Sequence, residues 1–206
     1  PVNVSLLATS SINKTAGVTD ITAAGTGNLL FKITGLNGNI NLAGLEINTG
    51  GNFTASAGNN AGNVLLGKIT AANNVYIEAD GGDITLNTGG ITAASNSLHL
   101  IAKSNITVGT AAITGNLTLT GPSPSMSIEA DSDITIHGDA TVFASTKSGW
   151  ITMRGATAPK ARNITVRDVS VTAADSKGAA WFDATQDITA RNVSVQVGGV
   201  TNNDAS

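Results

Sequence analysis

Residues 69–86 read ITAANNVYIEADGGDITL, and residues 91–108 repeat the pattern as ITAASNSLHLIAKSNITV. The first residues of the two copies are 22 positions apart, and so are the last residues. The same spacing joins four isoleucines: Ile47, Ile69, Ile91 and Ile113. A period of this length without a helical pattern is typical of a solenoid, in which each repeat forms one coil.

A short β pattern recurs within and beyond these repeats. An Asn or Asp is followed by an apolar, a polar and an apolar residue, so the two apolar side chains point to one face and the polar one to the other. The pattern begins at Asn39, Asn52, Asn74, Asp83, Asn105, Asn116, Asp133, Asn163 and Asp187. Asn and Gly suit the corners between strands because both tolerate positive φ. The sequence therefore predicts an all-β fold, a right-handed parallel β-helix with about 22 residues and three short strands per coil.

The composition excludes several classes of protein. Helix formers are scarce, and the absence of Cys rules out disulfides and zinc–thiolate sites. The net charge of −3 argues against nucleic acid and anionic membranes as partners. No apolar run approaches the roughly 18 residues of a membrane span, so none is expected. Aromatic residues make up only 3% of the chain, so the core is expected to be aliphatic.

The spacing also predicts how the chain is organised. We expect residues 1–206 to form a single β-helix segment of about nine coils, roughly 45 Å long. Because the chain starts at Pro1, we expect it to be a fragment of a longer protein. Residues 1–28 are expected to form an irregular or edge coil. The interval from Ile106 to Ile134 is 28 residues, which predicts an inserted loop at 120–125. Residues 141–206 form variant coils that hold all four Arg and both Trp.

The best candidates for recognition lie in those variant coils. Trp150, Arg154, Trp181 and Phe182 are rare residue types in this composition. Aromatic rings stack on sugar faces, and Trp and Arg are enriched in binding hot spots. The alternative is that Trp150 and Phe182 fill the interior of a locally wider coil.

Other polar residues are interpreted as structural. Two acidic clusters, Glu78–Asp83 and Glu129–Asp133, have the oxygen ligands that Ca²⁺ prefers, but a corner role for their carboxylates is favoured, and no metal or cofactor is predicted. Seven Asn-x-Ser/Thr sequons are explained by the β pattern itself, although glycosylation there stays open: they begin at Asn3, Asn13, Asn52, Asn105, Asn116, Asn163 and Asn192.

Catalysis has little support in the sequence. His99 alternates with two leucines and is expected at the surface. Arg167 and Arg191 occupy equivalent positions in two repeats, so with Asp168 they predict a cross-strand ion pair rather than a catalytic group. We therefore predict no catalytic residue and no enzyme activity.

The strands of the form Asn/Asp-Ile-Thr-Leu/Val/Ile, the Gly-Asn and Gly-Gly corners and the Ala/Thr-rich, Cys-free composition resemble the shaft repeats of filamentous haemagglutinin-like exoproteins of bacterial two-partner secretion. The resemblance covers roughly residues 29–200. It implies a right-handed β-helix and export by an outer-membrane secretion partner to the surface or surroundings of a Gram-negative bacterium. The Asn-Pro-Asn-Gly type of motif found in the family's secretion domain is absent here.

The resemblance implies an adhesin or haemagglutinin-type stalk that attaches to a receptor or glycan on host or bacterial cells, or that presents a C-terminal effector. Two alternatives remain open. A polysaccharide lyase or hydrolase on the same scaffold requires Asp, Arg and Lys to converge on one face. A ligand-capturing exoprotein requires long insertions.

Overall fold

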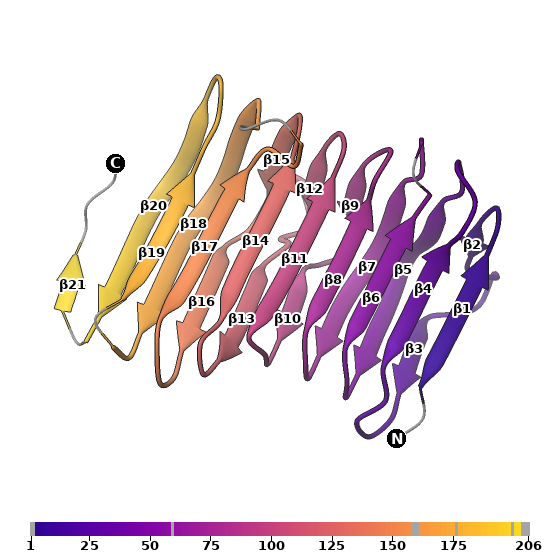
Figure 1. The fold of residues 1–206 in the computed structure, drawn as a ribbon, viewed down its shortest axis with the longest axis horizontal. Coiled ribbons are helices and arrows are strands. Elements are labelled where there is room, and N and C mark those ends of the chain that lie inside the picture. Colours follow the sequence, from indigo (N-terminus) through magenta and orange to yellow (C-terminus); the bar gives the residue numbers. More distant parts are fainter. Residues whose placement is uncertain (1–2, 59, 158–160, 176, 199, 203–206) are drawn as a thin grey trace.

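In the computed structural model, which describes residues 3–58, 60–157, 161–175, 177–198 and 200–202, the chain is a parallel β-solenoid without helices. It makes about eight turns of roughly 24 residues each. The chain advances steadily from one end of the stack to the other (Figure 1). The predicted all-β parallel solenoid is confirmed, with one coil fewer and a slightly longer repeat than expected. Nothing in the described part of the chain is a helix long and apolar enough to cross a membrane.

The solenoid has three sides, which we call faces A, B and C. Each coil contributes a strand, or half of a long strand, to each of them. Face A consists of β1 (Val4–Ala8), β4 (Leu29–Ile33), β6 (Phe53–Ala57), β8 (Val75–Ala79), β11 (Ser97–Ala102), β14 (Ser125–Ala130), β17 (Gly149–Arg154) and β19 (Gly178–Phe182). Short strands of face B are β2 (Ile12–Asn13), β9 (Ile84–Leu86), β12 (Ile106–Val108) and β15 (Asp133–Ile136). Short strands of face C are β3 (Asp20–Ala23), β10 (Ile91–Ala93), β13 (Leu117–Gly121) and β16 (Ala140–Ala144).

Four long strands turn the corner from face B to face C and join the two faces into one sheet. They are β5 (Ile40–Thr49), β7 (Val64–Ala71), β18 (Asn163–Ala173) and β20 (Ile188–Val197). The last strand, β21 (Val200–Asn202), pairs antiparallel with the end of β20.

The core consists of aliphatic columns inside the coils. On face A, Phe53, Val75 and Leu98 are in register on successive strands and are fully buried. The alternation predicted from the sequence produces this arrangement, because every second residue of a strand points inward. The first coil lacks a neighbour on its outer side, and its inward-facing Leu6 is therefore 46% exposed.

The corner asparagines link neighbouring coils. Along face B, the Oδ1 atom of Asn39 accepts the backbone N–H of Asn63 at 2.7 Å, and Asn63 Oδ1 accepts that of Asp83 at 2.8 Å. Asp83 continues the column by accepting the N–H of Asn105 at 2.9 Å. The predicted corner role is confirmed for this acidic position. Five of the seven sequon asparagines bond the backbone N–H of the next coil in this way: Asn3, Asn52, Asn105, Asn116 and Asn163.

The 22-residue series is wrong at its last member. Ile47, Ile69 and Ile91 are in register, but Ile91 pairs onward with Leu117, 26 residues away. Ile113 instead lies 41% exposed in a short hairpin that is closed by a bridge between Gly109 and Thr114.

The coil from Ile106 to Ile134 has 28 residues, six more than the coil before it, and these six residues lie at two corners. Four of them form the hairpin between β12 and β13, and the remaining two fall within 120–125, where β13 itself continues to Gly121. Gly109 has a φ of +78°, which permits the tight turn of the hairpin. The Ala-Ile-Thr pattern inside the hairpin imitates a strand, which explains why spacing alone placed the insertion in a single loop.

Candidate functional site

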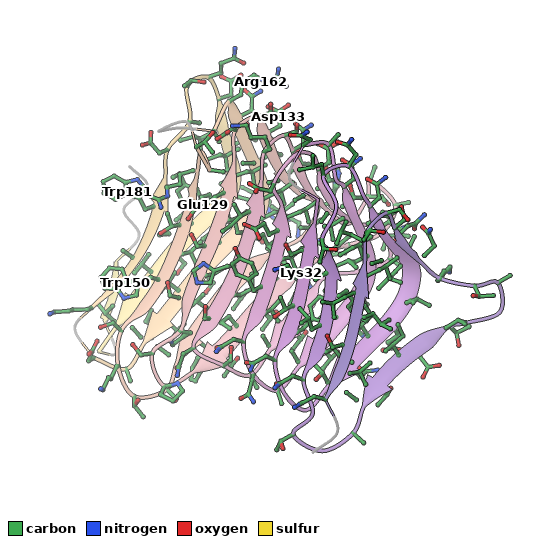
Figure 2. The ribbon with its side chains drawn as sticks, turned by 45° about the vertical axis from the view of Figure 1, so that its right-hand side comes forward. Lys32, Glu129, Asp133, Trp150, Arg162 and Trp181 are labelled. Atoms are coloured by element: carbon green, nitrogen blue, oxygen red, sulfur yellow. The ribbon has the colours of Figure 1, made fainter. Side chains whose placement is uncertain are left out.

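Two exposed tryptophans lie on adjacent strands at the C-terminal end of face A. Trp150 on β17 is 40% exposed and Trp181 on β19 is 64% exposed. In the register of these strands Trp150 lies opposite Ala179, and Thr152 lies opposite Trp181. The two indoles are therefore one strand and two residues apart and point to the same side. Both labels lie at the same end of the molecule in Figure 2.

A shallow hollow of about 380 Å³ lies between the indoles. Its lining is Trp150, Ile151, Thr152, Arg154, Ala179 and Trp181. The hollow exists because Ala179 and Thr152 are small side chains next to two large ones. It has aromatic walls and, from Thr152 and Arg154, hydrogen-bond donors at the rim.

Arg154 is held in place by an acidic neighbour. Its Nη2 donates to Oε1 of Glu129 at 3.2 Å, and the Ser127 hydroxyl donates to the same oxygen at 2.7 Å. Glu129 and Arg154 are register partners on β14 and β17. The guanidinium is thus held beside the hollow, although the side chain stays about half exposed to solvent.

Phe182 does not join this group. It is the register partner of the fully buried Met153, and its half-buried ring packs against the core. Adjacent strand residues point to opposite sides, so Trp181 and Phe182 cannot share a surface. The structure brings together Trp150, Arg154 and Trp181, places Phe182 inside and turns Trp150 outward.

A second aromatic pair lies on the same face, four strands from Trp181. The ring centroids of Tyr76 on β8 and His99 on β11 are 6.4 Å apart with a 40° angle between the planes. Burial, followed by the carboxylate of Glu78, raises the pKa of Tyr76 to about 12. A hydrogen bond between the phenol and Glu78 contributes to this rise. The composition does not single out this pair, but aligning the repeats with one inserted residue places both side chains at the same outward position.

Several other charged residues form ion pairs between coils. Arg167 bonds both oxygens of Asp139, at 2.7 and 2.8 Å, and Arg191 pairs with Asp168 as predicted. Arg162 pairs with Asp133 in the same manner. Hydrogen bonds from these arginines lower the pKa of each of the three carboxyls. The described residues contain no group of three or more His, Asp or Glu side chains arranged to hold a metal ion.

Comparison with known protein families, with curated proteins and with solved structures finds no match for this chain.

Proposed function

We propose that this protein is a stalk of an adhesin, and that it attaches to cells by binding glycans with the surface formed by Trp150, Arg154 and Trp181. The observation that carries the proposal is the pair of outward-facing indoles on neighbouring strands. Trp150 and Trp181 are 40% and 64% exposed, and they are neighbours. A contiguous exposed apolar patch rimmed by polar groups is typical of a binding site, whereas a single exposed apolar side chain is not. Sugar rings suit them, because their C–H faces stack on aromatic rings while their hydroxyls bond polar groups at the rim.

The solenoid supports the mechanical part of the proposal. Every coil is bonded to its neighbours by parallel strands on three sides, so the binding surface sits on a stiff support. A shallow hollow binds each ligand weakly, and many copies on one cell gain strength through multivalency.

The resemblance to filamentous haemagglutinin-like shafts supports a cellular setting for this activity. In that setting the protein is exported by an outer-membrane partner of a Gram-negative bacterium, stays at the cell surface or is released, and contacts a glycan or receptor on host or neighbouring bacterial cells.

Glycan arrays and cell-binding assays test the proposal with three proteins. Wild type binds, and Trp181→Ala loses most of its binding because one wall of the hollow is gone. Phe143→Ala is the matched control, since Phe143 is an exposed aromatic residue (46%) on β16 of face C, and this variant binds like wild type. Equal binding by wild type and Trp181→Ala removes this surface from the function.

A further inference from the structure

The outward residues of face A form a continuous lane along the solenoid axis. One column of register partners runs through Tyr76, His99, Ser127, Thr152 and Trp181. The column continues beyond Tyr76 through Thr54, Leu30 and Ser5, so its ring side chains stand at two places, Tyr76 with His99 and Trp181, with the small hydroxyl side chains of Ser127 and Thr152 between them. Ser127 is only 9% exposed and its hydroxyl is bonded to Glu129, so neighbouring side chains cover the middle of the lane.

The separation of the two aromatic positions is defined by the register. Trp181 and Tyr76 are separated by four strand steps, which corresponds to about 19 Å at the usual spacing between strands. A ligand that stacks on both aromatic positions must therefore be extended and must run along the axis, across the strands.

Charges beside the lane restrict the chemistry of this ligand. A neighbouring column contains Glu78, Ile101, Glu129 and Arg154 in register. The positive charge of Arg154 is matched by Glu129, whereas the hydrogen-bond partners of Glu78 are neutral hydroxyl groups, that of Ser56 at 3.2 Å and that of Tyr76. Lys32 lies two strands beyond Tyr76, and Figure 2 shows it far from the tryptophans with Glu129 in between. Lys32 continues the same column, but between Tyr76 and Trp181 the column carries two carboxylates against one guanidinium. This single net negative charge disfavours anionic sugars there, and the carboxylate oxygens accept hydrogen bonds from sugar hydroxyls.

We propose that this lane binds a neutral linear polysaccharide, with Trp150 and Trp181 forming one subsite and Tyr76 and His99 a second one. The inference rests on the proposed glycan-binding function and adds the ligand class, its direction and the second subsite. Because the two subsites are far apart, a short sugar occupies only one of them, and a longer one occupies both.

Calorimetric titration with a disaccharide and a hexasaccharide of β-linked glucose, mannose or N-acetylglucosamine tests this arrangement. Trp181→Ala weakens binding of both lengths. Tyr76→Ala weakens the hexasaccharide by roughly twofold to tenfold, as expected for losing one aromatic contact, and leaves the disaccharide unchanged. Phe143→Ala again serves as the control. Tyr76→Phe keeps the ring and binds like wild type, which separates stacking from any effect on folding.

Three results overturn the inference. The first is a Tyr76→Ala variant with unchanged hexasaccharide affinity, and the second is an equal loss in Tyr76→Ala and Tyr76→Phe. The third is a preference for an anionic galacturonate hexasaccharide over the neutral ones. In the first two cases a loss of binding in Trp181→Ala leaves the proposed function standing. If wild type binds no glycan at all, the proposed function itself fails.

Discussion

Asparagine amides fasten corners in both the early and the late coils, and the late coils add arginine–carboxylate pairs. Among the early coils, neutral amides such as Asn39 and Asn63 accept a backbone N–H from the next coil. Among the last coils, arginines such as Arg162 and Arg167 bind the carboxylates of the preceding turn. An amide acceptor has no charge to lose, whereas an arginine–carboxylate pair responds to pH and salt. The two regions share one core and differ in how their environment can loosen them.

The largest expected effect comes from the core that both regions share. Leu100 on β11 is fully buried, and Leu100→Ala is expected to lower the free energy of unfolding by about 2–5 kcal/mol, since it leaves a cavity. Ile101→Ala is the matched control, because its side chain is on the outer side of the same strand. Urea denaturation measures both variants, and a similar loss in the control would contradict the assigned inward and outward sides.

Two glycines, Gly50 in an early coil and Gly149 in a late one, differ in how much room they leave for a side chain. A Cβ at Gly50 would lie 1.4 Å from the carbonyl oxygen of Gly25, so the backbone of one coil must move. At Gly149 the nearest atom is a side-chain carbon of Val142, at 3.0 Å. We expect Gly50→Ala to destabilise the protein by about 1–3 kcal/mol or more, and Gly149→Ala by less. Thermal unfolding followed by circular dichroism ranks the two variants, and the reverse order would contradict the prediction.

The asparagine column gives a smaller effect. Asn63→Ala removes the acceptor for the Asp83 N–H, at an expected cost of about 1 kcal/mol. Asn63→Asp keeps an acceptor oxygen, as Asp83 does one coil later, and is expected to stay near wild type at neutral pH. Hydrogen exchange at the Asp83 amide measures the loss directly. An unchanged exchange rate of the Asp83 amide in Asn63→Ala would show that the bond to Asn63 does not stabilise this corner.

The smallest effect is the response of the two regions to acid. The pKa values of Asp133 and Asp139 lie below their ordinary value of 3.8, chiefly because Arg162 and Arg167 donate hydrogen bonds to them. Their stabilisation is present above pH 3.8 and is lost as the pH falls through the lowered values. Acidification to pH 3 is therefore expected to increase hydrogen exchange in β18 more than in β6, after correction for intrinsic rates.

Asp139→Asn is the control for this acid response, because position 139 then no longer titrates and the added pH dependence shrinks. Equal acid sensitivity of β18 and β6 in wild type would show that the ion pairs do not distinguish the regions.

The fold could be predicted from the sequence because each coil repeats the same alternation. Ile69 and Ile91, for example, are one repeat apart in the chain and are register partners on neighbouring strands. Ile113 was misplaced because a hairpin with a strand-like sequence shifted the count, and only three-dimensional pairing reveals that shift.

The candidate site was only partly predictable. Composition identified Trp150, Arg154 and Trp181, but it gave no direction for their side chains. Strict alternation already implied that Trp181 and Phe182 point to opposite sides. The pairing of Tyr76 with His99 required the register of neighbouring coils, because the two residues are 23 positions apart.

The parallel stacking of coils also determines how the protein responds to tension. A pull on its two ends acts along the inter-strand hydrogen bonds, so these bonds unzip in sequence instead of shearing together. Each coil released in this way adds about 24 residues of slack, roughly 80 Å when fully extended. Extension is therefore expected to proceed in steps of one coil, each of which dissipates part of the applied force.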